Sequence, residues 1–169
     1  MIDDAAQLLD ELACHRIEGI AAHGSTPVSA PLLTQIDETL WQGGCVQGVD
    51  LGGYFQHIVS LYSGERFNPG CDLASFVEVR LFDESRVPNP EMLYHLARWV
   101  NLCRARGRVL VHCQAGLNRS ALVTGLALVL AGLTPTEAIT TLRKRSPAIL
   151  CNKYFERWLL SQGGSNAQS

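Results

Sequence analysis

The segment that most constrains this chain is 109–120, which reads VLVHCQAGLNRS. A short run of β-branched and apolar residues comes first, then a cysteine, a glycine-containing loop, an arginine and a serine, and a long apolar segment follows at once. This order predicts a strand, a tight loop and a buried helix. The segment therefore favours an α/β fold in which a loop joins a strand to a buried helix.

Cys113 stands where this loop leaves the strand. A thiol acts as a nucleophile only as thiolate, and an ordinary cysteine is ionised to only a few per cent at neutral pH. The N-terminus of the following helix and the fixed charge of Arg119 would both favour an anion here, either a thiolate or a phosphate. We therefore expect Cys113 to be a catalytic nucleophile rather than a small apolar residue buried at a strand end.

The neighbours of Cys113 suit a cradle for a phosphoryl group. Gly116 lets backbone N–H groups turn inward, and Arg119 presents a planar fork to two phosphate oxygens. Ser120 can donate a hydrogen bond to the sulfur and help it leave, and His112 can hold the loop in shape. The expected substrate-binding residues are Gln114, Ala115, Gly116, Leu117, Asn118 and Arg119.

The spacing of this cysteine and arginine is not diagnostic alone. Cys151 and Arg157 have the same spacing. That second pair has no glycine between its members and no strand before it, and its pattern is typical of an amphipathic helix. We interpret the second match as a coincidence.

The segment 112–120, HCQAGLNRS, resembles the signature loop of the dual-specificity protein phosphatases. Segment 34–44, TQIDETLWQGG, resembles the family's first strand and its glycine pair, and 146–152, SPAILCN, resembles the approach to its last helix. The resemblance covers about residues 34–160. One departure is Asn118, where many members have serine. Members with asparagine there include RNA 5′-triphosphatase-like enzymes.

The resemblance implies a mechanism and a set of roles. The cysteine, Cys113, would form a phospho-cysteine intermediate and Arg119 would bind the phosphoryl group. An aspartate on an upstream loop would be the general acid, and Asp83 lies on the loop between a predicted strand at 76–81 and a predicted helix that Asn89 caps. A leaving oxygen needs a proton as its bond to phosphorus breaks. Glu84 is the alternative to Asp83.

Three parts are expected along the chain. Residues 1–33 predict a helix over 3–22 and a linker or an extended connection at 25–31. Residues 34–161 form the phosphatase-like domain, and residues 162–169 form a flexible polar tail. The alternation of strands and helices predicts a single α/β domain with a mostly parallel central sheet flanked by helices. A length of 169 residues fits one such domain.

Charge and cysteine usage limit the partners. The first 65 residues hold one basic and nine acidic residues, and the rest hold thirteen basic and seven acidic ones, so the part with Cys113 suits an anionic substrate. The six cysteines form no C-x-x-C pair, so buried thiols in a reducing cytoplasm are expected rather than a metal site. The acidic N-terminus is unlike a secretory signal, and the apolar run at 121–133 is too short to cross a membrane. We expect a cytoplasmic protein without metal, cofactor or membrane contact.

Together these inferences predict a metal-independent phosphomonoester hydrolase acting on phosphotyrosine of proteins, with phosphoserine and phosphothreonine as a second substrate class. A short chain favours a shallow pocket that admits both. The alternatives are the same mechanism on an RNA 5′-phosphate end, a phosphoinositide or a sugar phosphate, and a non-catalytic phospho-binding module. The expected partner is a phosphorylated protein, and nucleic acid only under the RNA alternative. A reaction that needs ionised Cys113 and protonated Asp83 predicts a bell-shaped pH profile.

Overall fold

The computed structural model describes residues 12, 15–20, 27–144 and 146–164. Its centre is a five-stranded sheet in the order β3-β4-β7-β5-β6, in which β4, β7, β5 and β6 run parallel and β3 is antiparallel to β4. The strands are β3 (Leu33–Gln35), β4 (Leu40–Gly43), β5 (His57–Ser60), β6 (Ser75–Glu78) and β7 (Val109–His112). The mostly parallel sheet confirms the predicted fold class.

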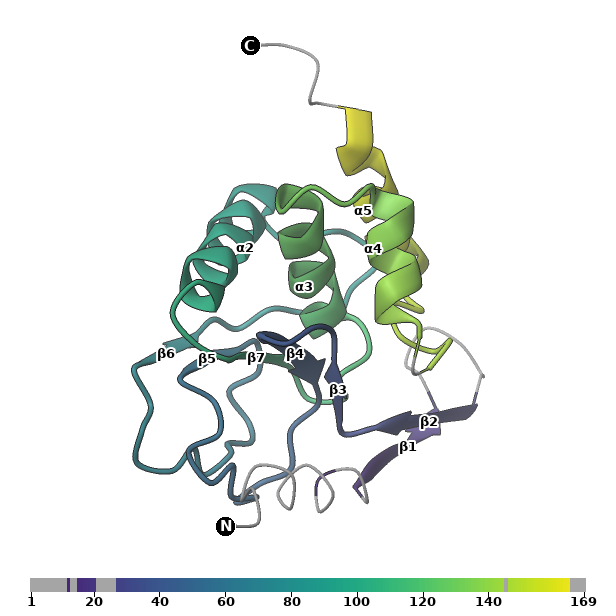
Figure 1. Ribbon diagram of the computed structural model, residues 1–169. Helices are drawn as coiled ribbons and strands as arrows, with labels where there is room; N and C mark the ends of the chain where they lie inside the picture. The colour runs from purple at the N-terminus through teal and green to yellow at the C-terminus, as the bar shows by residue number, and fades with distance from the viewer. Residues whose placement is uncertain (1–11, 13–14, 21–26, 145, 165–169) are drawn as a thin grey trace.

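Helices α2 to α5 lie on one side of this sheet (Figure 1). They are α2 (Pro90–Arg104), α3 (Arg119–Leu130), α4 (Pro135–Leu142) and α5 (Lys153–Leu160). The larger apolar cluster is formed by these helices and the sheet. A second, separate cluster includes Trp41, Leu51, Phe55 and Phe67. Within the described ranges, no helix has the length and apolar character needed to cross a bilayer.

The helices begin where the sequence predicts. Asn89 caps α2 by accepting a hydrogen bond from the N–H of Met92 at 3.2 Å. Thr134 and Glu137 form a capping box at the start of α4. Helix α3 is buried from Ser120 to Leu128, which explains why this segment is apolar on all sides. Because α3 begins where the Cys113 loop ends, its N-terminus adjoins that loop.

The N-terminal prediction of a helix over 3–22 is wrong for its last part. Arg16–Ile20 form a strand, β1, which pairs antiparallel with β2 (Pro27–Pro31). Within the segment 25–31, predicted as a linker or an extended connection, the described residues 27–31 form this strand, which fits the extended alternative. The reason is long-range packing, because Val28 and Ala30 of β2 are buried against Leu117 of the Cys113 loop. The remainder of the predicted helix lies outside the described residues, except for Leu12 and His15.

The C-terminal tail also differs from its prediction. Helix α5 ends at Leu160 as expected, but Ser161–Gly164 continue as a 3₁₀ turn, η1. The side chain of Gln162 accepts a hydrogen bond from the Tyr94 hydroxyl at 2.5 Å, which ties this turn to α2. Residues 165–169 of the predicted flexible tail lie outside the described part of the chain.

Candidate active site

Cys113 lies directly after β7, and its sulfur is enclosed by the loop that follows. The backbone N–H of Gly116 donates to Cys113 Sγ at 3.3 Å, and Ser120 Oγ lies 3.4 Å from the same sulfur. Gly116 has a φ of +69°, and a Cβ there would lie 2.3 Å from the backbone nitrogen of Gly44. The loop therefore needs glycine at 116 both for its left-handed backbone and for its contact with the end of β4.

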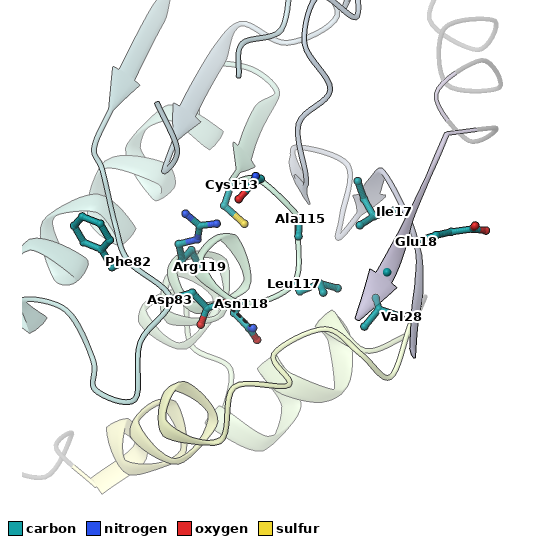
Figure 2. Close-up of a pocket in the computed structure, with 12 residues that line it drawn as sticks. Ile17, Glu18, Val28, Phe82, Asp83, Cys113, Ala115, Leu117, Asn118 and Arg119 are labelled. Carbon is teal, nitrogen blue, oxygen red and sulfur yellow. Dashed lines mark hydrogen bonds between the residues drawn. The ribbon is translucent and has the colours of Figure 1, made fainter. Parts of the chain in front are cut away.

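Cys113 lines a cavity of about 360 Å³. Figure 2 shows the side chains that surround it, which come from the Cys113 loop, from the segment after β6 and from the β1–β2 hairpin. Residues on its wall include Ile17, Glu18, Val28, Phe82, Asp83, Cys113, Gln114, Ala115, Leu117, Asn118 and Arg119. The structure thus places most of the sequence-predicted site residues on one cavity. Cys151 and Arg157, the second cysteine–arginine pair, are not among the residues that line it.

Arg119 is the first residue of α3 and is half-buried beside Cys113. Its Nη1 donates to the carbonyl of Leu81 at 3.3 Å, and its guanidinium lies 5.4 Å from the centre of the Tyr62 ring. These two contacts orient the planar fork at the cavity wall (Figure 2). Tyr62 is a contact that the sequence did not predict, because only its place near the end of a strand could be inferred.

Asp83 is held by two asparagines from distant parts of the chain. Asn118 Nδ2 donates to one carboxylate oxygen at 2.9 Å, and Asn152 Nδ2 donates to the other at 2.7 Å. The backbone N–H of Asn152 also donates to Asn118 Oδ1 at 2.8 Å, which links the two residues that hold Asp83. In Figure 2 the Asp83 carboxylate is turned toward Asn118. Asn152 was predicted as the cap of the last helix, which the structure confirms, but its contact with Asp83 was not foreseen.

Glu84, the alternative acid, is directed elsewhere. Its carboxylate accepts a hydrogen bond from Arg86 Nε at 3.0 Å and does not line the cavity that holds Cys113. Of the two acids, Asp83 is the one on the cavity wall. The geometry therefore favours Asp83 as the proton donor.

His112 is the last residue of β7, next to Cys113, and is almost fully buried. Its Nδ1 lies 3.4 Å from the carbonyl oxygen of Cys113, and its ring contacts the edge of Phe67 with centroids 5.1 Å apart. Burial lowers the pKa of His112 to about 4, against the smaller opposing effects of the Cys113 carbonyl and of Glu78. The imidazole is therefore neutral at physiological pH and acts as a structural support.

Two further features of the site were not predicted. The first is Gln42 of β4, whose buried side-chain amide contacts both Ser120 and Gly116. The second is the β1–β2 hairpin, which covers Leu117 and supplies Ile17 and Val28 to the cavity wall. Gln42 lies in a segment that the sequence marked only as a strand and its end. The sequence did not predict the hairpin because the apolar residues of this segment have a helix-like spacing.

The comparisons with known proteins agree with this geometry. The family model described as "Dual specificity phosphatase, catalytic domain" matches residues 72–163, which is more than half of the chain. The chain therefore belongs to the dual-specificity phosphatase family and is a phosphatase of that superfamily. The search against curated proteins gave no significant match.

Solved structures show the same fold at low sequence identity. DUSP15 is 22% identical with a TM-score of 0.67, covering 80% of this chain and 90% of its own. Human DUSP28 is 22% identical with a TM-score of 0.60, covering 79% and 93%. PTPMT1 in complex with PI(5)P is 17% identical with a TM-score of 0.60, covering 77% and 93%. These similarities establish the fold but do not distinguish among substrates.

Proposed function

We propose that this phosphatase hydrolyses phosphotyrosine in proteins through a phospho-cysteine on Cys113, with phosphoserine and phosphothreonine as slower substrates. The observation that carries the proposal is that Cys113, Arg119 and Asp83 line one cavity together with apolar side chains. The phosphoryl group would lie in the loop and the rest of the substrate between the apolar walls.

In the first step, the Cys113 thiolate attacks phosphorus as the bond from phosphorus to the tyrosine oxygen breaks. The loop N–H groups and Arg119 stabilise the charge on the equatorial oxygens, and protonated Asp83 gives its proton to the leaving oxygen. The helix dipole of α3 adds to this stabilisation because its N-terminus begins at Arg119.

In the second step, the Asp83 carboxylate takes a proton from water, the water oxygen attacks phosphorus, and the bond between sulfur and phosphorus breaks. The products are inorganic phosphate and the Cys113 thiolate. The amides of Asn118 and Asn152 both donate to Asp83, which is an arrangement suited to the carboxylate form needed here.

The cavity walls support an aryl phosphate as the preferred substrate. In Figure 2, Phe82 lies to the left of Arg119, and Ile17 and Val28 project from the hairpin on the right. A flat apolar ring has more contact with such walls than a serine or threonine side chain has. Among the described residues of the wall, Arg119 is the one cation while Glu18 and Asp83 are acidic, which disfavours polyphosphorylated headgroups and RNA ends.

Phosphate release from a matched substrate panel tests the proposal. The panel holds phosphotyrosine and phosphothreonine peptides of the same sequence, a phosphoinositide and a 5′-triphosphate RNA, all assayed with EDTA. We expect wild type to act on the phosphotyrosine peptide first and Cys113→Ser to release no phosphate. Turnover confined to lipid or RNA would replace the proposed substrate, and no turnover of any substrate would favour a binding module.

The hairpin wall gives a sharper test of substrate class. Ile17→Ala should raise KM for the phosphotyrosine peptide by about tenfold, because the ring loses part of its apolar wall. The same change should leave KM for a small alkyl phosphate unaltered. Leu130→Ala, at an exposed position on the last turn of α3, is the matched control. Equal effects of Ile17→Ala on both substrates would contradict the role of the hairpin in binding the ring.

A further inference from the structure

Gln42 occupies an unusual place for a side-chain amide. It lies on β4, is 1% exposed, and is paired in register with Val111 of β7, two residues before Cys113. Its Nε2 donates to the carbonyl of Gly116 at 3.1 Å, and its Oε1 accepts from Ser120 Oγ at 2.8 Å. A buried amide is costly unless both of its ends are hydrogen-bonded, and here both ends bond to residues around Cys113.

The contact with Ser120 matters because a hydroxyl has only one proton to donate. Two acceptors compete for that proton, namely Gln42 Oε1 at 2.8 Å and Cys113 Sγ at 3.4 Å. In this structure the hydroxyl donates to Gln42. A thiolate on Cys113 would then rely on the N–H of Gly116 as its donor from the loop.

We propose that Gln42 is a positioning residue that acts through Ser120. It holds the Ser120 proton away from the sulfur in the resting enzyme, which keeps the thiolate nucleophilic. As the sulfur–phosphorus bond breaks in the second step, charge builds on sulfur and the hydroxyl turns from Gln42 to Cys113. The part of this inference that concerns the second step rests on the proposed function, whereas the competition for the proton does not.

The test is the pH dependence of Cys113 alkylation by iodoacetamide, followed by peptide mapping so that reaction at the exposed Cys71 is counted separately. Gln42→Met removes the competing acceptor at similar volume, so Ser120 should donate fully to the thiolate. We expect the midpoint of the alkylation profile to fall by about one pH unit. In a Ser120→Ala background the same substitution should cause no shift.

The charged and titratable groups around the sulfur are unchanged in both backgrounds, so they cancel in this comparison. These groups lie on the elements that surround the sulfur. They are His112 at the end of β7, Arg119 at the start of α3, Asp83 between β6 and α2, Glu18 on β1, and Cys45 after β4.

Thr34→Val is the matched control. Thr34 pairs in register with Gln42 on the neighbouring strand and is 3% exposed, and its Oγ1 has no hydrogen-bond partner among the described residues. Its substitution changes a buried polar group beside Gln42 without touching Ser120. The alkylation midpoint of this variant should equal that of wild type.

Gln42→Asn is a second variant in case Gln42→Met does not fold. It keeps a buried amide but is one methylene too short to reach Ser120, and it should lower the midpoint in the same Ser120-dependent way. An equal shift with and without Ser120, or no shift in either variant, would overturn the proposal. Turnover of p-nitrophenyl phosphate by wild type is measured in parallel. A Ser120-dependent shift without turnover would sink the proposed function while the competition for the proton stands.

Discussion

The loop that carries Cys113 and the segment that carries Asp83 meet at one cavity but are held by different means. The Cys113 loop is fixed at both ends by regular structure, with β7 before it and α3 after it, and its backbone contacts the end of β4. Residues 79–89 lie between β6 and α2 in irregular structure, and Asp83 is held by the side chains of Asn118 and Asn152. The Cys113 loop is therefore positioned mainly by its flanking strand and helix and by backbone contacts with β4, to which Gln42 adds one buried side chain. The position of the acid depends instead on two side chains 35 and 69 residues away.

This difference implies that the two parts of the site can fail separately. Changes to the Cys113 loop should affect every substrate, because all need the same cradle. Changes to the support of Asp83 should affect the first step mainly for substrates whose leaving oxygen is strongly basic, because only these need proton donation in that step.

The largest expected effect is that of Asp83→Asn. Loss of the proton donor should lower kcat for a phosphotyrosine peptide by about 10²- to 10⁴-fold and remove the fall of activity on the alkaline side of the pH profile. A pH–rate profile of both proteins measures this. Glu84→Gln is the control and should keep the wild-type profile, because Glu84 bonds to Arg86 outside the cavity. An unchanged profile for Asp83→Asn would refute its assignment.

The next effect concerns the buried support of the Cys113 loop. Burial lowers the pKa of His112 to about 4, below the value of about 6.5 expected in the unfolded chain. The unfolded state then binds more protons between these two values, so this group makes stability fall as pH falls below about 6.5. The loss should be about 2–3 kcal/mol between pH 7 and pH 4.5.

Urea unfolding of wild type and His112→Gln at both pH values isolates this contribution. The variant should lose less stability on acidification than wild type does, even where it is less stable at pH 7. An equal loss in both proteins would mean that His112 is protonated in the folded state or is exposed to water.

The smallest expected effect is that of Asn152→Ser. Serine can still cap α5, so the helix should persist, but Asp83 loses the donor at 2.7 Å. We expect kcat for a phosphotyrosine peptide to fall by about threefold to tenfold. The burst of aryl release from an aryl phosphate with a weakly basic leaving group reports the first step alone and should be unchanged. A loss of equal size in that burst would show that the substitution disturbs the cradle and not the acid alone.

The sequence predicted the parts of the molecule whose geometry is local. Segment 109–120 carries its own strand, turn and helix signals, and the helices around it have caps that can be recognised from three or four residues. The placement of Cys113 and Arg119 on one cavity could be predicted because the loop itself sets their spacing. Asp83 could be placed on the right loop from the strand before it and the helix after it.

What the sequence did not predict depends on contacts between distant residues. The apolar spacing over 3–22 fits a helix, but β2 pairs with Arg16–Ile20 and packs Val28 against Leu117, and no local signal marks that partner. Gln42 and Asn152 have ordinary local interpretations as a strand residue and a helix cap. Their contacts with Ser120 and Asp83 appear only when the sheet and the last helix are assembled.

The central claim is that Cys113 carries the phosphoryl group during turnover. The most direct measurement is rapid acid quenching of Asp83→Asn mixed with an activated aryl phosphate, followed by mass spectrometry of the peptide that contains Cys113. The activated leaving group should allow the first step while loss of the carboxylate slows the second, so this peptide should gain the mass of one phosphoryl group. Product release without that modification, or a phosphoryl group found on another residue, would contradict the mechanism.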